Sequence, residues 1–399
     1  MPLYLGLDSS TQSLSAIVLE IDSDRRRVVF EESMSFDEGF PEYGTEHGVL
    51  RSPDQAVAVS SPLMWAAALD AMMARIAWRI DVGRLAAIAG SAQQHGSVYL
   101  NASATAALAA LDPERPLVEQ VEPMLSRAVS PIWMDSSTGA ECREIAAAVG
   151  GDASLAQHTG SRAFERFTGP QIRKFASHEP AAYAATDRIH LVSSFLASLL
   201  AGRHAPIDPG DGSGMNLMDL TSANWWDPAV AATAPGLAAK LPALAPASSI
   251  VGPLATYWQK RYGFPSASVV VWSGDNPCSL IGTGLVREGR LAVSLGTSDT
   301  VFGLMEHLTG NLAIFVRIIF MRRLETVPRS PGCAHNGAGW PPPPPLRLPA
   351  RDASRGRICR RVADRTQCVP PPPTRLSLRH VSAVTVLIRG VGDIGSAGA

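Results

Sequence analysis

Three short turns built largely from small residues carry side chains that could bind phosphate or metal. They are Gly6–Gln12 (GLDSSTQ), Ser273–Asn276 (SGDN) and Gly296–Thr300 (GTSDT). Each turn follows an apolar run typical of a buried strand, and each offers a carboxylate or a pair of hydroxyls. Open α/β sheets place such turns at the carboxyl ends of strands, where ligands bind. Three of them in one chain predict a cleft that handles phosphate and metal.

Each turn also has an ordinary structural interpretation. Asp8 fits a hairpin turn, and Asp275 fits the N-cap of a helix that begins near Pro277. The segment 296–298 fits a simple turn between two strands. Spacing alone favours the structural role for both aspartates, so the chemical role needs support from the rest of the chain.

The hydrophobic pattern of the first hundred residues predicts several strands and one long helix. We expect strands at 3–8, 13–21, 27–36 and 85–92 and a helix at 53–79. The last strand ends in the polar turn Gln93-Gln94-His95-Gly96. Three strands, a helix and a further strand indicate an α/β domain of the kind found in ribonuclease H and actin.

The next part of the chain has a different character. Residues 102–245 are rich in alanine and broken by glycine and proline, which predicts short helices. One of them should span 136–148 and be capped by the Ser136-Ser137-Thr138 cluster. A strand at 269–272, a helix at 277–285 and a strand at 291–295 are then expected. Strands that end in small polar turns thus recur here, as at the N-terminus. We therefore expect a second domain, similar to the first, to begin near residue 273.

This second domain breaks off after about Leu308. Proline runs follow at 341–345 and 370–373, and a proline run cannot join a helix or sheet interior. Fourteen arginines, no lysine and four acids give residues 311–399 a net charge of +10. Such basic, proline-rich sequence is typical of a disordered tail. A ligand for SH3-type domains or for an anionic surface is the alternative. The abrupt onset also resembles out-of-frame translation, so we expect a truncated or frameshifted chain.

Bulk composition narrows the class of protein. A length of 399 residues allows two or three domains, and the net charge of −1 argues by itself against a nucleic-acid partner. The five cysteines form no close pair, which argues against a zinc site or a disulfide framework. No segment approaches the roughly 18 apolar residues of a membrane span, and the N-terminus lacks a secretory signal. A cytoplasmic location without membrane partners is therefore expected.

Seven short motifs together resemble one family. They are LGLDSSTQ at 5–12, AQQHGS at 92–97, WMDSST at 133–138, TGSRAFERFTG at 159–169, DGSGMNL at 211–217, SGDN at 273–276 and SLGTSDT at 294–300. In this order they resemble the FGGY carbohydrate kinases, and within them the eukaryotic-type xylulose kinases. The resemblance covers residues 3 to 305. It implies a sugar-binding first domain at 1–272, the start of a second domain at 273–308, and an unrelated tail at 309–399.

The resemblance implies a role for each site residue. Asp275 is expected to be the catalytic base, because a carboxylate beside the acceptor hydroxyl can take its proton. Sugar contacts are expected from His95, Gln94, Arg166, Asn276 and Asp275. Phosphate and metal contacts are expected from Asp8, Ser10, Thr11, Gln12, Gly296, Thr297 and Ser298, with Asp8 orienting Mg²⁺ through water. Structural alternatives remain, such as a turn role for His95 and a solvent-exposed or Glu165-paired side chain for Arg166.

The function implied by the resemblance is ATP-dependent phosphorylation of D-xylulose to D-xylulose 5-phosphate. ATP and Mg²⁺ are the expected cofactors, and a monomer or homodimer is the expected state. The family's adenine-binding loops are not visible in the sequence, so the chain is expected to be impaired in catalysis. The alternatives are a sugar-binding remnant without activity and a kinase of a related ketose or polyol.

Overall fold

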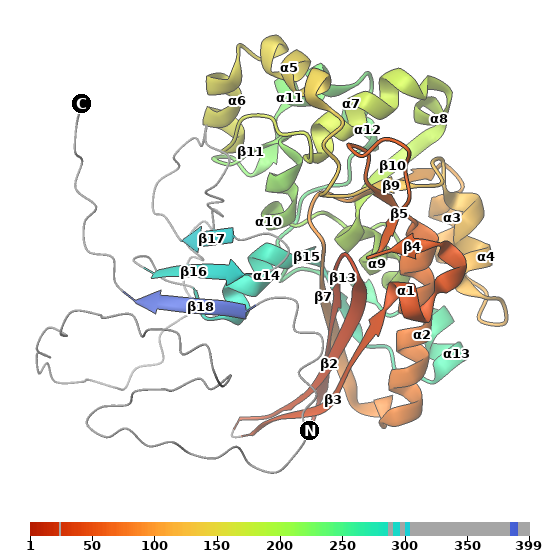
Figure 1. The fold of residues 1–399 in the computed structure, drawn as a ribbon. Coiled ribbons are helices and arrows are strands. Elements are labelled where there is room, and N and C mark those ends of the chain that lie inside the picture. Colours follow the sequence, from red (N-terminus) through yellow and green to blue (C-terminus); the bar gives the residue numbers. More distant parts are fainter. Residues whose placement is uncertain (24, 286–289, 296–299, 304–383, 390–399) are drawn as a thin grey trace, which may run out of the picture. The chain divides into compact units, whose positions relative to one another are not determined.

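The computed structural model describes residues 1–23, 25–285, 290–295, 300–303 and 384–389 (Figure 1). The chain divides into two compact units, residues Met1–Arg322 with Thr385–Ala399, and residues Arg323–Val384. Apart from Val384, every described residue belongs to the first unit. Most of the tail that the sequence predicts to be disordered lies outside the described residues, and the predicted domain boundaries stay a prediction.

A seven-stranded mixed sheet is the scaffold of the first unit. Its order is β13-β14-β7-β1-β2-β3, and β15 also pairs with β7. The strands are β1 (Leu3–Ser9), β2 (Ser13–Ile21), β3 (Arg26–Ser35), β7 (Leu85–Ala92), β13 (Ile250–Pro253), β14 (Ser268–Val270) and β15 (Ser273–Gly274). The first four lie within one residue of the predicted strands at both ends. Only β7, β14 and β15 run parallel to β1 or to each other, whereas β2, β3 and β13 run antiparallel to their neighbours.

Alternation of side chains explains why β1 forms a strand. Leu3, Leu5 and Leu7 are buried on one face, whereas Tyr4 and Asp8 lie on the other and are less buried. Successive side chains of a strand point to opposite faces, so an alternating pattern commits one face to the core. The sequence therefore decides which face of β1 meets the helices and which face carries Asp8.

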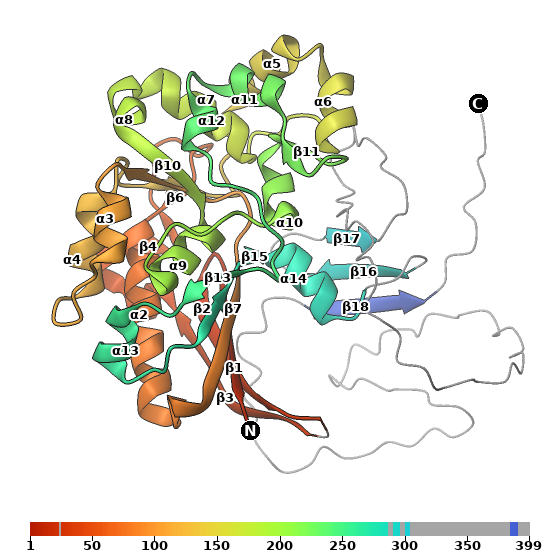
Figure 2. The same ribbon diagram turned by 180° about the vertical axis from the view of Figure 1, so that it is seen from behind.

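Three helices pack on the apolar face of the sheet. They are α2 (Pro62–Arg79), α9 (Val192–Ala201) and α13 (Thr256–Tyr262). In both views α2 runs along β2 and β3 with α13 beside it, and α9 lies near the centre of the unit (Figures 1 and 2). All ten residues of α9 are buried, as expected for a helix that is enclosed on every side.

The long helix begins later than the sequence suggests. The expected helix at 53–79 is observed only from Pro62, and Val59–Ser60 form the short strand β6 instead. Pro62 explains the difference, because proline is tolerated in the first helical turn but disfavours a helical residue before it. The Ser61 hydroxyl accepts a hydrogen bond from the Met64 backbone N–H and so caps the new start.

A second, mostly helical region has its own apolar core. This core is centred on Tyr99, Phe175, Ile189 and Leu217. The helices around it are α5 (Gly139–Ala148), α6 (Asp152–Thr159), α7 (Thr168–His178), α8 (Pro180–Ala185), α10 (Pro209–Gly212), α11 (Asp227–Thr233) and α12 (Leu237–Lys240). The prediction of short helices for this part of the chain is confirmed.

The predicted cap of the helix at 136–148 is confirmed in position but not in its hydrogen bond. Helix α5 begins at Gly139, and Thr138 is its N-cap without a capping side-chain bond. The Thr138 hydroxyl donates to the Glu165 carbonyl, and the Ser137 hydroxyl donates to Asp135. Tertiary partners have therefore taken the hydroxyls that would otherwise cap the helix.

Shorter elements complete the described part of the chain. They are α1 (Phe36–Gly39), η1 (Pro41–Tyr43), β4 (Thr45–Glu46), β5 (Val49–Leu50), η2 (Val82–Arg84), β8 (Ser97–Asn101), α3 (Ala104–Ala109), α4 (Leu117–Val121), η3 (Glu122–Met124), β9 (Ser130–Pro131), β10 (Thr186–Leu191), η4 (Ser213–Met215), β11 (Met218–Asp219) and β12 (Asn224–Trp225). None of the helices in the described residues is long and apolar enough to cross a membrane.

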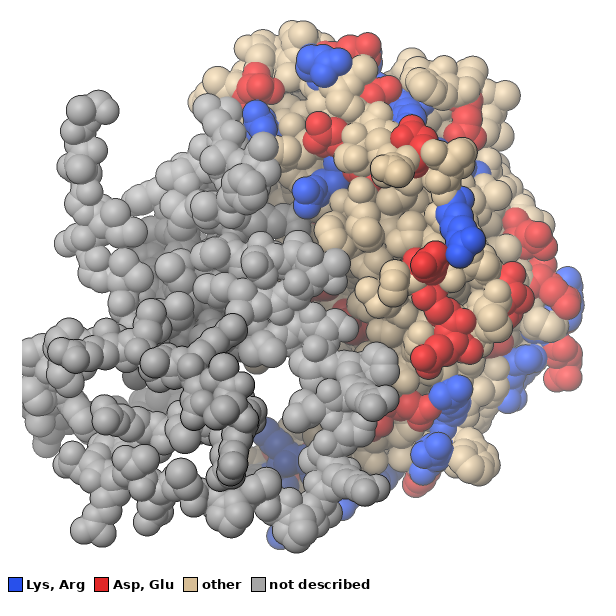
Figure 3. Space-filling model, in the orientation of Figure 1, with Lys and Arg blue, Asp and Glu red and all other residues tan. Residues whose placement is uncertain are grey.

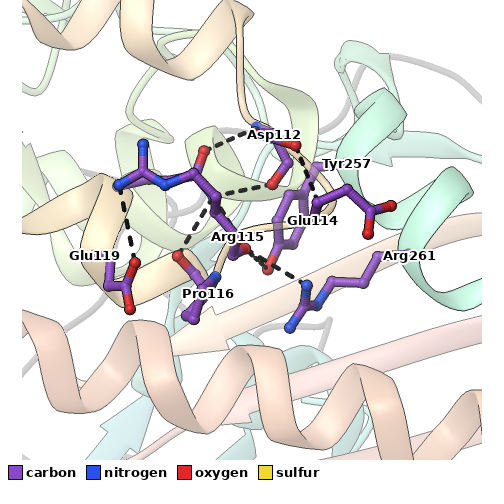
Figure 4. A network of polar contacts seen from close by, with 8 residues as sticks. Asp112, Glu114, Arg115, Pro116, Glu119, Tyr257 and Arg261 are labelled. Atoms are coloured by element: carbon purple, nitrogen blue, oxygen red, sulfur yellow. Dashed lines mark hydrogen bonds and ion pairs between the residues drawn. The ribbon is translucent and has the colours of Figure 1, made fainter.

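A polar network attaches the loop before α4 to α13 (Figure 4). The Arg261 guanidinium donates to the Pro113 carbonyl at 2.6 Å and also lies over the Tyr257 ring. From α4, Gln120 binds the Asp112 backbone of the loop through both its amide oxygen and its amide nitrogen. These bonds hold α13, and with it the chain that leads into β14, against the first part of the molecule.

The region after β14 largely follows the expected order. The strand expected at 269–272 is interrupted, because β14 ends at Val270 and β15 starts at Ser273. Helix α14 (Asp275–Gly282) starts two residues before the predicted position. Strand β16 (Arg290–Leu295) lies between β17 (Thr300–Gly303) and β18 (Val384–Arg389) in a separate three-stranded sheet. Six residues of the expected disordered tail thus form a strand.

The contact between Gly90 and Trp272 yields a test of this packing. A Cβ atom at Gly90 would lie 2.3 Å from the buried Trp272 ring. We expect Gly90→Ala to lower the free energy of unfolding by at least about 2 kcal/mol, because the core must shift to admit the methyl group. Chemical denaturation measures the effect.

Gly39→Ala is the matched control for Gly90→Ala. Gly39 is helical, and nothing lies within 4 Å of the position of its added Cβ atom. This variant should be neutral or slightly stabilising. Equal unfolding midpoints for the two variants would contradict the packing of Trp272 against β7.

Candidate functional site

Strand register brings two of the predicted turns, and the polar turn after β7, to one edge of the sheet. Asp8 of β1 and Ser273 of β15 both pair with Ser91 of β7, from opposite sides. Neighbouring strands lie about 4.8 Å apart, so the backbones of Asp8 and Ser273 are separated by about 10 Å. The residues that follow these strands therefore emerge side by side, as the sequence predicts.

Asp8 occupies one side of this row. Its carboxylate accepts a hydrogen bond from the Ser91 hydroxyl at 2.6 Å. Burial raises the pKa of Asp8, and the bond from Ser91 opposes that shift. The next side chain, Ser9, points to the opposite, buried face of β1, so it cannot share a ligand with Asp8. The Asp8 carboxylate by itself is an oxygen ligand of the kind that Mg²⁺ prefers.

The turn after β1 is held in place from two directions. The Trp133 indole N–H donates to the Thr11 hydroxyl at 2.8 Å. An indole nitrogen can only donate, so the Thr11 hydroxyl acts as acceptor and keeps its own proton for another partner. On the other side, a Cβ atom at Gly48 would lie 1.8 Å from the Thr11 carbonyl oxygen. Gly48 also has a φ of 77°, so the position requires glycine twice over.

The rest of that turn is more open. The Ser10 hydroxyl donates to the Ser13 carbonyl at 3.1 Å, and the Gln12 side chain is exposed. The Gln12 carbonyl accepts from the Phe36 backbone N–H. Ser10, Thr11 and Gln12 thus lie together beyond Asp8, where backbone and hydroxyl groups can meet an anion.

The turn after β7 carries Gln94 and His95. His95 has a φ of 71°, an unusual conformation for a residue other than glycine. Its Nδ1 lies 2.7 Å from the Gly214 carbonyl, and its ring packs against Phe167 at a centroid distance of 5.0 Å. His95 is buried, so a structural interpretation and a ligand-binding one are compatible with its position.

Gln94 connects this turn to the start of α14. The Asn276 side-chain amide donates to the Gln94 carbonyl oxygen at 2.9 Å. Both the backbone N–H and the side-chain amide of Asn276 donate to one oxygen of Asp275, at 2.8 and 3.1 Å. Asp275 is the first residue of α14, with Gly274 as the N-cap, so the structural alternative of an N-cap role for Asp275 does not apply.

Two further aspartates lie beneath this group and were missed in the sequence. On the face shown in Figure 3, acidic and basic side chains are interspersed over the surface, whereas Asp208 and Asp211 are buried. Asp208 accepts from the Ser273 hydroxyl at 2.6 Å, and Asp211 accepts from the Ser193 hydroxyl at 2.5 Å. The available signal was the motif DGSGMNL, which begins at Asp211, whereas Ser193 is one of three serines in α9 and does not stand out.

Burial dominates the electrostatics of both hidden acids. Burial raises the pKa of Asp208, while bonds from Ser273 and nearby backbone groups oppose the shift. Burial, together with the charges of Asp275 and Asp208, raises the pKa of Asp211 to about 7, against bonds from Ser193 and Gln94. Asp211 is thus close to half-protonated at neutral pH.

Cys278 marks the centre of the acidic group. Burial, followed by the charges of Asp211, Asp208, Asp8 and Asp275, raises the pKa of the Cys278 thiol to about 12. Four carboxylates thus act on one side chain, although they come from β1, from α10 with the residue before it, and from α14. The thiol stays neutral and cannot serve as a nucleophile near neutral pH.

The remaining predicted site residues are not joined to this group. Arg166 is exposed, and among residues 1–23 and 25–285 it makes no hydrogen bond or ion pair, including with Glu165. Its neighbour Phe167 packs on His95, so the loop that carries Arg166 borders the turn. Gly296, Thr297 and Ser298 lie outside the described residues.

The arrangement has a clear chemical bias. The rim consists of Asp275, Asn276, Gln94 and His95, which offer acceptors and amide donors. Such groups suit a ligand with several hydroxyls, because buried polar groups penalise a ligand that leaves them unpaired. Asp8 and the turn beyond it lie on the same edge of the sheet and suit an anion with a divalent cation.

Comparison with known proteins supports this interpretation. Residues 116–282 match the FGGY family of carbohydrate kinases, N-terminal domain. Xylulose kinase 2 of Arabidopsis thaliana is 48% identical over 313 residues, covering 78% of this chain and 56% of that protein. Xylulose kinase of Mus musculus is 45% identical over 300 residues, covering 75% and 54%. The chain spans about half the length of the curated relatives it matches.

A solved structure supports the fold independently. The ligand-bound xylulose kinase of Lactobacillus acidophilus superimposes with a TM-score of 0.61 at 17% identity, over 75% of this chain and 54% of that one. At this identity the likeness concerns the fold alone. It confirms the predicted α/β architecture of the ribonuclease H and actin kind.

The raised pKa of Asp211 predicts a pH dependence of stability. The unfolded carboxyl titrates near 3.8 and the folded one near 7, so the folded state holds the extra proton between these values. Stability should therefore fall as the pH rises from about 4 to 7, by up to about 4 kcal/mol from this group. Asp211→Asn should remove that part of the slope in urea unfolding at pH 5, 6 and 7.5.

Asp54→Asn is the control for this slope. Asp54 is exposed and only accepts a local bond from the Ala56 backbone N–H. Its replacement should leave the pH dependence of unfolding as in the parent chain. A slope that survives in Asp211→Asn would show that another group is responsible.

Proposed function

Because this chain carries the N-terminal domain of the FGGY family of carbohydrate kinases, we propose that its described part binds a sugar and that the protein is an ATP-dependent kinase acting on D-xylulose. The observation that carries the proposal is the meeting of Gln94 and His95 with Asp275 and Asn276 at the carboxyl edge of the sheet. The sugar is proposed because the relatives are xylulose kinases, and the polar rim is compatible with it.

Asp275 is the proposed general base. It accepts two hydrogen bonds from Asn276, which orient the carboxylate and stabilise its charge. In the proposed reaction, the terminal hydroxyl of the sugar gives its proton to Asp275 as its oxygen attacks the γ-phosphorus of ATP. The bond from the γ-phosphorus to the β–γ bridging oxygen breaks, and ADP leaves with that oxygen. A positioned carboxylate of this kind is what such a transfer requires, since catalysis depends chiefly on positioning and on charge stabilisation.

The sugar contacts are proposed from four further side chains. Gln94, His95 and Asn276 form the connected part of the rim. Arg166 is exposed and lies next to Phe167, which packs against His95 of the rim. We propose that the Arg166 side chain extends from this loop toward the bound sugar. Loss of any one hydroxyl partner should weaken a matching ligand more than a ligand that lacks that hydroxyl.

The phosphate side is proposed from the turn after β1. Asp8 would hold Mg²⁺, and Ser10, Thr11 and Gln12 would face the phosphates, with Gly296, Thr297 and Ser298 completing the loop pair. When bound, the metal supplies charge neutralisation for the transferred phosphoryl group. The residues of this chain contribute an oxygen donor at Asp8 and a turn held rigid by Trp133 and Gly48.

A sugar-binding protein without phosphoryl transfer is the second candidate. The observation in its favour is that the family match at residues 116–282 is to the N-terminal domain and includes the proposed sugar contacts Arg166, Asp275 and Asn276. The first candidate also has a variant, namely a kinase that acts on a related ketose or polyol instead of D-xylulose. A cytoplasmic location and a monomeric or homodimeric state stay predictions.

Thermal unfolding of the full chain with a sugar panel tests the proposal. We expect D-xylulose to raise the melting temperature, because a ligand that binds only the folded state stabilises it. Ribulose, xylitol and glycerol should raise it less at equal concentration. Coupled measurement of ADP release with D-xylulose then separates a kinase, which releases ADP, from a sugar-binding protein, which does not.

His95→Asn tests the rim directly. Asparagine tolerates the left-handed backbone at this position, so the turn should be retained while the imidazole is lost. We expect at least about a tenfold loss of D-xylulose affinity, the scale of one lost buried hydrogen bond. His178→Asn changes an exposed histidine at the end of α7 and should leave affinity unchanged. A wild-type response from His95→Asn would remove this histidine from the site.

A further inference from the structure

Asp211 is a buried carboxyl group for which the proposed reaction has no use. It is 1% exposed and lies in α10, beneath the start of α14. One oxygen accepts from the Ser193 hydroxyl at 2.5 Å, whereas the other makes no hydrogen bond of ordinary geometry within the described part of the chain and has only a weak interaction with the Gln94 amide. A charged carboxylate in such a place lowers the stability of the folded state, unless it is protonated or compensated by donors. Its presence therefore calls for an explanation, such as a function.

This second oxygen faces the backbone that carries Asp275. A Cβ atom at Gly274 would lie 2.9 Å from this Asp211 oxygen and 2.8 Å from the Gln94 amide nitrogen. Gly274 immediately precedes Asp275, so Asp211, Gln94 and the proposed base meet around one glycine. The Gln94 amide nitrogen also points toward the Gly210 carbonyl at 3.4 Å, which is a long bond.

Three titratable groups lie around Asp211 in the described part of the chain. They are Asp275 and Cys278 on α14 and Asp208 ahead of α10, within residues 1–23 and 25–285. Cys278 is a neutral thiol. Asp208 has donors of its own, from the Ser273 hydroxyl and from the backbone N–H groups of Gly210 and Ala247. Asp275 is therefore the partner whose charge matters most, and it contributes to the raised pKa of Asp211 directly after burial and the Ser193 bond.

The two carboxyls are solvated differently. Asp275 is only partly buried and receives two donors from Asn276. Asp211 is enclosed and receives one hydrogen bond of ordinary geometry, from Ser193, besides the weak interaction with Gln94. Two neighbouring carboxylates repel each other, so a proton taken up by the pair is held at the site where charge is least stabilised. That site is Asp211.

We propose that Asp211 is a positioning residue of the sugar site, which carries the one proton that it shares with Asp275 and so leaves Asp275 as the charged acceptor. The assignment of a sugar as ligand rests on the proposed function, whereas the pairing of the two carboxyls does not. Protonated Asp211 is a neutral neighbour, and its ionisation places a second negative charge beside the base.

The pair has a consequence for ligand binding. A polyol that covers Asp275 displaces water, and repulsion between the two carboxylates is screened less when water is absent. Binding should therefore favour the protonated form of Asp211. Near pH 7.5, where much of Asp211 is ionised, each bound polyol should draw part of one proton from solvent onto the Asp211 carboxylate, with no other bond made or broken.

The first test uses the free protein and needs no ligand. Carboxyl signals of the full chain labelled with carbon-13 at aspartate are followed by NMR from pH 5 to 9, and the signal missing in Asp211→Asn is assigned to Asp211. We expect a midpoint near 7. Asp275→Asn should move this midpoint to lower pH, because a repelling charge is lost. Ser193→Ala should move it to higher pH, because a bond that stabilises the carboxylate is lost.

Asp22→Asn is the control for the free-protein test. Asp22 lies in the β2–β3 turn, where it accepts from the Arg25 backbone N–H, far along the strand from the site. It should leave the midpoint unchanged. If the titration midpoint of Asp211 is the same in Asp275→Asn as in the parent chain, the pairing of the two carboxyls is wrong, even if Asp211 titrates near pH 7. A midpoint below 5 in the parent chain would overturn the proton on Asp211.

The second test measures protons taken up with the sugar. Titration calorimetry of D-xylulose binding at pH 7.5, in two buffers of different ionisation enthalpy, gives the number of protons exchanged. We expect net uptake of a fraction of one proton by the parent chain and none by Asp211→Asn, which mimics the neutral form. Ser193→Ala should change the uptake and serves if Asp211→Asn does not fold.

The two failures are distinguishable. Sugar binding with equal uptake in the parent chain and Asp211→Asn overturns the role of Asp211 while keeping the proposed function. Absence of D-xylulose binding at any pH contradicts the proposed function, and the free-protein midpoints then still decide whether the two carboxyls share a proton. A purely structural Asp211 would change stability but would leave both the Asp275→Asn shift and the proton uptake unexplained.

Discussion

The parallel pairing of β1, β7 and β15 is the constraint on which the site depends. Asp8 and Ser273 lie opposite the same residue of β7, so the turns that follow these three strands must emerge at one edge. A shift of one residue in either ladder would turn every side chain to the other face of the sheet. Leu3, Leu5 and Leu7 resist that shift, because they would leave the core beneath α2 and α9. The buried leucines on the apolar face of β1 therefore fix the strand register that brings the polar residues together at the edge of the sheet.

Because the turns converge at one edge, four aspartates lie close together there. Asp8, Asp208, Asp211 and Asp275 all act on the thiol of Cys278, and three of them have a pKa raised by burial. Hydroxyl groups offset part of the cost, since Ser91, Ser273 and Ser193 each donate to one buried acid. Such an arrangement favours ligands that bring hydroxyl protons or a cation, and disfavours additional anions without a metal. The proposed pairing of a polyol with a metal-bound phosphate fits this balance.

Rigidity of the two turns comes from outside them. Trp133 and Gly48 hold Thr11, while Gly214 and Phe167 hold His95. These supports belong to segments far apart in the sequence, some of them in the helical region with its own core. The helical region thus contributes to the site by bracing the turn after β7, in addition to carrying Asp211 in α10. Preorganised groups of this kind lose little freedom when a ligand binds.

Much of the scaffold could be predicted because its determinants are local. The apolar alternation of β1 and β2 set those strands to within a residue. The small polar turns after β1 and β15 marked Asp8 and Asp275 as residues at strand ends. Differences arose where another residue overrode a local signal. Thr138 donates its hydroxyl to Glu165 instead of capping α5 through its side chain, and Pro62 delays the start of α2.

The sequence by itself determined which residues stand at the strand ends and which family motifs they belong to. Only the tertiary structure decided how charged those residues are. Asp211 and Asp275 are the same amino acid in similar polar motifs, yet one is enclosed with a single donor of ordinary geometry and the other is partly open with two. The free energy of a charge depends on the groups and water packed around it, and those come from α9, α10 and α14 together. No local pattern contains that information.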